Sequence, residues 1–154
     1  MGEYSNRIKL KVLKSSLRLE KTASYSLAFI LGINDPENSK SLGNKTSSLS
    51  FNQKLNLLLD SGSITKTDKL KLEIFMEVRN QFMHNLDVYS FKEVFQLLEG
   101  REKKLKKIYP IFFSDSIDIE KSFEECITKI YSEGISCFAS FKGERLRKFR
   151  SLNG

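Results

Sequence analysis

A stretch without glycine or proline, residues 66–99, limits most strongly how this chain can fold. These two residue types are the usual interruptions of helices, so their absence allows long continuous helices. Within the stretch, the apolar residues Leu70, Ile74, Val78 and Phe82 recur at intervals of four residues, which is typical of the buried face of an α-helix. The whole chain has only two prolines, and no segment has a convincing strand pattern. We therefore predict an all-α fold.

The expected architecture is a single domain, residues 1–154, built as a bundle of about five helices. Helices are expected at residues 4–31, 51–60, from 65 to at least 84, 91–108 and from 119 onward, and the third either ends in a turn at residues 85–87 or continues past His84. The first of these is either one helix or two, with a break at Ser15 and Ser16. Ser90 and Glu93 form a capping box that starts the fourth helix, and Asp118 is expected to cap the last one.

Two segments differ from this helical pattern. Residues 34–50 are rich in Ser, Asn, Lys and Gly. This connection is long for a compact domain, so we expect it to be either mobile or functional. Residues 142–154 form a basic tail at a chain end, where fraying is common.

Composition narrows the possible functions. The net charge of +7 fits a polyanionic partner, and it equally fits simple solubility. One histidine and two cysteines cannot complete a zinc site, so neither a metal nor another cofactor is expected. Cys126 and Cys137 are separated by roughly 16 Å along one expected helix, which is too far for a disulfide. No segment has the apolar run of a signal peptide or a membrane span, so a cytoplasmic protein is expected.

The only histidine, His84, lies near the end of the expected central helix. Asn80, Glu77 and Glu73 precede it at helical spacing and form a polar row along a helix otherwise built for burial. Asn80 is one turn before His84, within hydrogen-bonding reach, and Arg79 adds a permanent charge on the neighbouring flank. A lone histidine on a helix is more often structural than catalytic. The two glutamates would also repel a phosphate unless they are solvated or paired with basic groups.

The segment Arg79-Asn80-Gln81-Phe82-Met83-His84 resembles the RNxxxH motif of the HEPN superfamily (higher eukaryotes and prokaryotes nucleotide-binding domains). Residues 51–95 look similar to the mannitol-operon-repressor-like branch of that superfamily. The resemblance implies a HEPN-like helical bundle, a homodimer and, as in many members, a metal-independent RNase. Leu86 stands where members paired with a nucleotidyltransferase antitoxin carry a tyrosine, which makes that pairing doubtful.

This resemblance leads to two hypotheses. In the first, the protein is an RNA-directed endoribonuclease in which Arg79 and His84 are catalytic and Asn80 supports the histidine. Imidazole suits proton transfer near neutral pH, and guanidinium suits a phosphate. One histidine cannot comfortably be both acid and base, so a homodimer must bring two copies of His84 into one cleft. In the second, the protein is a non-catalytic dimeric regulator or interaction module, and the same residues tie helices together or form the dimer interface.

Two basic segments are candidate contacts for the backbone of RNA. They comprise Lys103, Lys104, Lys106 and Lys107 on the fourth expected helix, and Arg145, Arg147 and Lys148 in the tail. Contacts of this kind supply affinity without sequence specificity. The alternative interpretation is that both segments are solvated helix faces.

Overall fold

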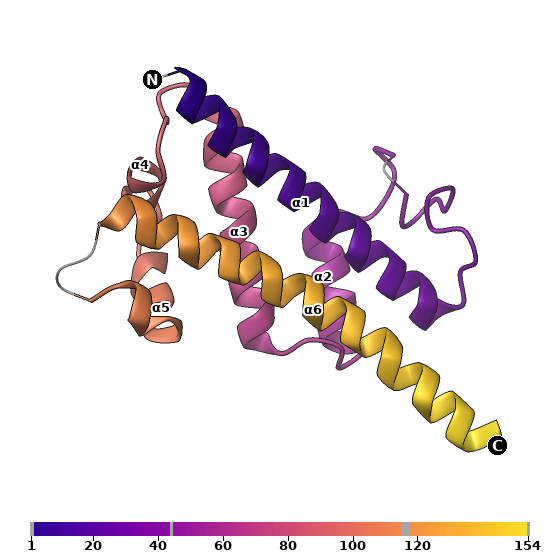
Figure 1. Cartoon of the computed structure of the whole chain (residues 1–154). Coiled ribbons are helices and arrows are strands. Elements are labelled where there is room, and N and C mark those ends of the chain that lie inside the picture. The colour runs from indigo at the N-terminus through magenta and orange to yellow at the C-terminus, as the bar shows by residue number, and fades with distance from the viewer. Residues whose placement is uncertain (1, 44, 115–117, 154) are drawn as a thin grey trace. The chain divides into compact units, whose positions relative to one another are not determined.

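The computed structural model of the chain describes residues 2–43, 45–114 and 118–153, without the side chains of residues 140–150 and 153. These residues form six α-helices and one short 3-10 helix, with no strand among them, which confirms the all-α prediction (Figure 1). The elements are α1 (Gly2–Leu31), α2 (Phe51–Asp60), α3 (Lys66–His84), α4 (Phe91–Gln96), α5 (Arg101–Ile108), η1 (Pro110–Phe112) and α6 (Ile119–Asn153).

The structure decides between the two alternatives for the first helix and changes one other expected boundary. The first helix has no break at its serine pair, because Ser16 is buried and its hydroxyl donates to the carbonyl oxygen of Leu13 at 2.7 Å. The prediction of one continuous helix over residues 91–108 is wrong. Gly100 has a φ of +78°, in the left-handed region that favours glycine, and the chain therefore divides into α4 and α5 at this point.

Local capping residues set the starts of α3 and α4, as the sequence indicates. The hydroxyl of Ser90 accepts from the backbone N–H of Glu93 at 3.2 Å, and the Glu93 carboxylate accepts from the N–H of Ser90 at 2.9 Å. A further bond, from the N–H of Tyr89, holds the pKa of Glu93 below its ordinary value. Thr65 and Asp68 form the equivalent reciprocal pair at the start of α3. The predicted Ser90–Glu93 capping box is therefore confirmed, and α3 begins with a second box of the same kind.

The chain divides into two compact units. Unit 1 contains residues 1–16 and 70–132, and unit 2 contains residues 17–69 and 133–154. Each unit has its own buried residues, and the assignment of the whole chain to one domain stays a prediction. Within the described residues, no helix has the length and apolar character that crossing a bilayer requires.

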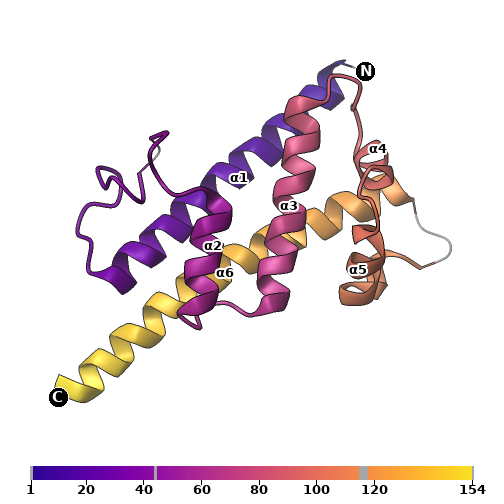
Figure 2. The same cartoon turned by 180° about the vertical axis from the view of Figure 1, so that it is seen from behind.

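The core of unit 1 lies between α3, α4 and the first turns of α6 (Figure 2). Ile74, Val78 and Phe82 of α3 are buried, as expected from their spacing, whereas Leu70 at the start of the same stripe is only half-buried. Phe91 of α4 stands edge-on to Phe82, with 5.2 Å between ring centroids, and edge-on to Phe123 of α6 at 6.0 Å. Edge-to-face contacts are a favoured aromatic geometry and add to the stabilisation from apolar burial.

Unit 2 is built from the second half of α1, α2 and the second half of α6, and its buried residues include Leu19, Leu27, Leu55 and Leu58. The hydroxyl of Ser26 donates to the carbonyl oxygen of Phe138 at 3.0 Å and so joins α1 to α6. Residues 34–50 also belong to this unit and loop back beside the end of α1 before α2 begins (Figure 1).

Glu120, in the first turn of α6, holds three parts of unit 1 together. Its carboxylate accepts hydrogen bonds from the backbone N–H groups of Phe91 at 3.1 Å and Lys92 at 2.7 Å. These amides belong to the first turn of α4, where N–H groups have no partner within the helix. The hydroxyl of Tyr4, on α1, donates to the same carboxylate at 2.7 Å. This bond, together with burial, raises the pKa of Tyr4 from 10.0 to about 12.

The Tyr4 hydrogen bond predicts how stability depends on alkaline pH. Because the pKa of Tyr4 is raised on folding, its contribution is fully present below pH 10 and is lost as the pH rises through about 12. Tyr4→Phe removes this contribution at every pH. The free energy of unfolding of the wild type should therefore exceed that of Tyr4→Phe near neutral pH, and the difference should shrink between pH 10 and 12. Urea denaturation of both proteins between pH 7 and 12 measures this difference in the free energy of unfolding. A difference that does not change with pH would contradict the raised pKa of Tyr4.

Candidate functional site

The candidate motif lies at the C-terminal end of α3, in unit 1. Val78 and Phe82 turn one face of the helix inward, whereas Asn80 and His84 are exposed. The helix ends at His84, and the next residues form a turn in which the Asn85 side chain accepts from the backbone N–H of Asp87 at 3.1 Å. The motif histidine is therefore the last residue of a well-packed helix, and it faces solvent.

Arg79 and Asn80 are joined by a direct hydrogen bond. The Arg79 Nη1 donates to the Asn80 Oδ1 at 2.9 Å. Among the described residues no hydrogen bond joins Asn80 to His84, so Asn80 positions the arginine rather than the imidazole. Sequence spacing alone could not choose between these partners, because both lie within reach of the Asn80 amide.

Arg79 also retains hydrogen-bonding capacity. Its side chain is half-buried, and its Nε is buried without a hydrogen-bond partner among the described residues. A buried donor without a partner is uncommon in folded proteins, because it has lost its hydrogen bonds to water without forming one within the protein. A guanidinium is a planar, permanently charged donor that is suited to an anionic oxygen, such as that of a phosphate.

The acidic residues of the motif helix are not all free carboxylates. Glu77 accepts from the Arg101 Nε at 3.0 Å, and both side chains are about one third exposed. This ion pair joins α3 to the first residue of α5. It agrees with the interpretation that a glutamate of the polar row bridges to a basic group of a neighbouring helix. The pairing also reduces the repulsion that Glu77 would exert on a phosphate near Arg79.

Arg101 was not singled out by the sequence, although it lies at the edge of the lysine run. Besides its bond to Glu77, its Nη1 is buried and has no partner within the described part of the chain. Unit 1 therefore contains two arginines with unsatisfied buried donors, Arg79 on α3 and Arg101 on α5. The contact with Glu77, which is remote in sequence, and the buried Nη1 distinguish Arg101 from the exposed lysines of α5.

The lysine run lies on α5, and its four members are all exposed. Lys106 places its ammonium 5.7 Å from the centre of the Phe95 ring, within the range of a cation–π contact. The side chains of Arg145, Arg147 and Lys148 fall outside the described residues, although the backbone of α6 passes through these positions.

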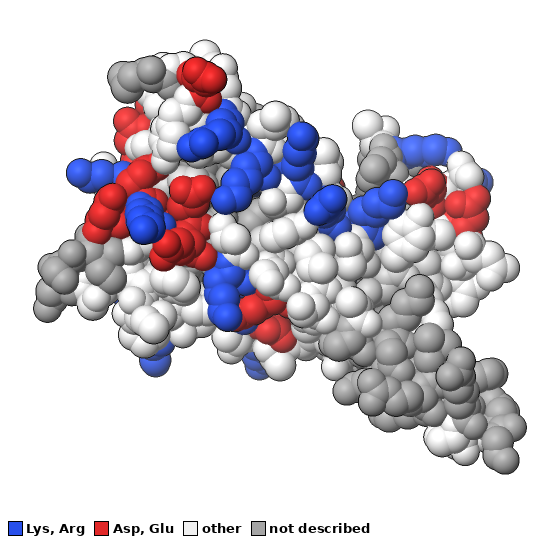
Figure 3. Space-filling model, in the orientation of Figure 1, with Lys and Arg blue, Asp and Glu red and all other residues white. Residues whose placement is uncertain are grey.

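Basic side chains elsewhere in unit 1 are mixed with acidic ones. Figure 3 shows Lys and Arg side chains over the first half of α1, with Asp and Glu side chains near the first turns of α6. Lys11 and Glu124 form an ion pair of this kind at 3.0 Å. Such a mixed surface provides less attraction for a polyanion than the lysine run of α5 does.

Comparison with protein-family models, with curated proteins and with solved structures finds no match to this chain. We therefore infer function from the motif residues, their geometry and their chemistry. Within the described residues, no group of three or more His, Cys, Asp or Glu side chains is arranged to hold a metal ion. Cys126 and Cys137 are not joined to each other by a disulfide.

Proposed function

We propose that the protein is a HEPN-like, RNA-directed endoribonuclease that needs no metal ion and acts as a homodimer. The observation that carries the proposal is an exposed His84 that lies five residues after a half-buried Arg79 on α3. These are a group that can transfer protons and a cation that can bind phosphate, and both belong to the last turns of one helix. Asn80 fixes the direction of the guanidinium through its Oδ1.

The proposed reaction uses the ribose 2′-hydroxyl as the nucleophile. A neutral His84 removes the proton from this hydroxyl, and the oxygen attacks the adjacent phosphorus. A protonated His84 from the second protomer gives its proton to the departing 5′-oxygen, so that no net proton is consumed. The products are a 2′,3′-cyclic phosphate and a 5′-hydroxyl. Arg79 stabilises the additional negative charge on the phosphorane oxygens.

An exposed apolar side chain beside the motif supports self-association. Leu86 follows His84 by two residues and is 84% exposed. A single exposed leucine is ordinary, but this one adjoins the position where the mechanism requires a second protomer. A two-fold interface that covers Leu86 would bring both copies of the α3 terminus close together.

A non-catalytic dimeric regulator is the second candidate. The observation that favours it is the Arg79–Asn80 hydrogen bond, because an internally paired arginine can serve to hold its own helix end. In that case the exposed motif would form part of an interface with the second protomer. The two candidates predict the same dimer and differ only in RNA cleavage.

The proposed function is tested by incubating the purified wild type with a mixture of RNAs in the presence of EDTA. Cleavage is expected to continue and to leave 2′,3′-cyclic phosphate and 5′-hydroxyl ends. The same RNAs with 2′-O-methyl groups should remain intact, because the nucleophile is blocked. No cleavage of any RNA, or products with 5′-phosphate and 3′-hydroxyl ends, would exclude this mechanism and leave the regulator as the better candidate.

A further inference from the structure

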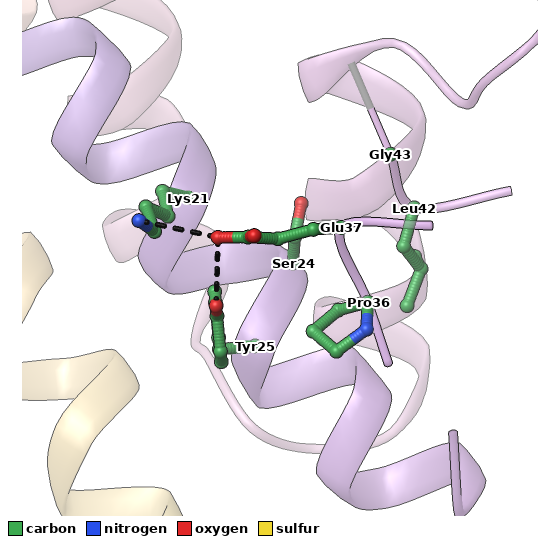
Figure 4. A pocket seen from close by; sticks show the side chains of 7 residues that line it. All are labelled: Lys21, Ser24, Tyr25, Pro36, Glu37, Leu42 and Gly43. Carbon is green, nitrogen blue, oxygen red and sulfur yellow. Dashed lines mark hydrogen bonds and ion pairs between the residues drawn. The ribbon is translucent and has the colours of Figure 1, made fainter. Parts of the chain in front are cut away.

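The 34–50 connection and the second half of α1 enclose a pocket in unit 2. Its volume is about 270 Å³, slightly below the range of roughly 300–1,000 Å³ that is typical of small-molecule sites. Figure 4 shows that Lys21, Ser24 and Tyr25 of α1 face Glu37 and Leu42 of the connection. Every residue that lines the pocket belongs to unit 2, and none belongs to the motif of α3.

The wall formed by the connection is held by its own hydrogen bonds. The Asp35 carboxylate accepts from the backbone N–H of Asn38 at 3.3 Å and from its side-chain amide at 2.7 Å. Gly43 packs against the preceding turn so closely that a Cβ there would lie 2.7 Å from the carbonyl oxygen of Ser39. An alanine at this position would therefore displace the backbone. A loop with this many internal bonds presents a largely preformed surface.

A buried lysine anchors the same wall to α2. Lys54 is 3% exposed, and its ammonium donates to the carbonyl oxygen of Leu42 at 3.3 Å. Burial lowers the pKa of Lys54, which means that the folded protein solvates this ammonium less well than water does. The Lys54 side chain thus holds the backbone of Leu42 in place, and Leu42, which is 2% exposed, lines the pocket. The cost of this contact is the partial desolvation of the ammonium.

The pocket contains one carboxylate with a free oxygen. The Glu37 Oε1 accepts from the hydroxyl of Tyr25 at 2.9 Å and from the ammonium of Lys21 at 3.3 Å. These two interactions hold the pKa of Glu37 below its ordinary value, so the group is an anion at neutral pH. The Oε2 has no partner among the described residues and remains available as an acceptor.

The Lys21 ammonium indicates what the pocket can hold. It lies against Glu37 and 5.8 Å from the centre of the Tyr25 ring, which is the environment that attracts organic cations. The Lys21 side chain is 64% exposed, so a ligand can displace it at little cost in packing. Lys21 therefore acts as a tethered alkylammonium at the mouth of the site. Its place could be taken by a free molecule of the same chemistry.

Two further features define the rest of the ligand. Ser24 is 6% exposed, lines the pocket and makes no hydrogen bond to any described residue, so its hydroxyl can anchor a second polar group. Pro36 and Leu42 are buried residues that supply an apolar surface to the same cavity. The combination suits a short carbon chain that carries a positive charge at one end.

We propose that this pocket binds a small organic ammonium ion, with its charge on Glu37 and Tyr25 and its apolar body against Pro36 and Leu42. The inference is independent of RNA cleavage, since no residue of the α3 motif contributes to it. An exposed ion pair is worth up to about 1 kcal/mol, so the charge should improve binding about fivefold over a neutral molecule of equal size.

The test is an NMR titration of the full-length ¹⁵N-labelled protein with n-butylammonium, 1-butanol and butyrate. Butylammonium should shift the amides of Ser24 and Gly43 in a saturable manner, about fivefold more tightly than butanol. Butyrate should bind more weakly than either. Equal affinity for butylammonium and butanol, or a preference for butyrate, would overturn the proposal.

Two variants test whether Glu37 binds the positive charge of the ligand and whether Lys21 competes with it. Glu37→Gln should reduce butylammonium affinity to the level of butanol, whereas Glu99→Gln, an equal charge change on an exposed residue of unit 1, should leave it unchanged. Lys21→Gln removes the tethered competitor and should therefore raise the affinity for butylammonium while leaving that for butanol unchanged. This gain cannot result from misfolding. A loss of affinity in Lys21→Gln would contradict the proposal, as would an unaltered affinity in Glu37→Gln.

Discussion

Replacing His84 by alanine is expected to reduce RNA cleavage by about 10²- to 10⁴-fold, the usual loss when a proton-transfer group is removed. The melting temperature should change by no more than about 1 °C, because an exposed side chain contributes little packing. Single-turnover cleavage and differential scanning calorimetry measure the two effects. If His84 were structural, the variant would instead melt lower and show no change in cleavage.

A control and a second substitution sharpen this experiment. Gln96→Ala, at an exposed polar position of α4, should leave both cleavage and melting unchanged. Arg79→Lys keeps the positive charge but loses the planar donors, including the Nη1 that binds Asn80 and the unpaired Nε. Cleavage should therefore fall in this variant as well. Full activity of Arg79→Lys would show that charge alone suffices and would remove the role assigned to the guanidinium.

Glu120→Ala is expected to lower the free energy of unfolding by about 2–3 kcal/mol, since it removes a helix cap and a charged hydrogen bond together. The variant leaves the N–H groups of Phe91 and Lys92 and the Tyr4 hydroxyl without their acceptor. For a chain of this size the melting temperature should fall by roughly 4–12 °C. Urea denaturation and calorimetry provide the measurement.

Glu124→Ala is the matched control for this stability effect. Glu124 lies one turn further along α6, and it makes a partly exposed ion pair with Lys11. Exposed pairs of this kind contribute less than about 1 kcal/mol. Glu120→Ala should therefore be clearly the more destabilising variant. Equal effects of the two substitutions would show that Glu120 is also only a surface carboxylate.

Sequence patterns predicted those parts of the fold that depend on neighbours along the chain. The spacing of Ile74, Val78 and Phe82 predicted the buried face of α3, because helical periodicity alone decides which side chains share a face. The Ser90–Glu93 capping box likewise predicted the start of α4, since both partners lie within one turn. The end of α3 at His84 was left open by the sequence, because residues 85–87 fit both a turn and a further helical turn.

Features that depend on distant segments were not predictable in this way. Nothing in the sequence near Phe91 indicates that Glu120 caps α4, because the two residues are brought together only by packing. The left-handed conformation of Gly100 was missed because an isolated glycine is compatible with a helix. The choice of Arg79 rather than His84 as the partner of Asn80 depends on side-chain rotamers, which spacing does not determine.

The most direct test of a nuclease centre shared by two protomers is cleavage by mixed dimers. Wild type and the His84→Ala variant are unfolded together, refolded in varying ratios at constant total concentration, and assayed on RNA in EDTA. If each cleft needs a histidine from both protomers, activity should follow the square of the wild-type fraction. Activity proportional to the wild-type fraction would show that one His84 suffices and would contradict the shared cleft.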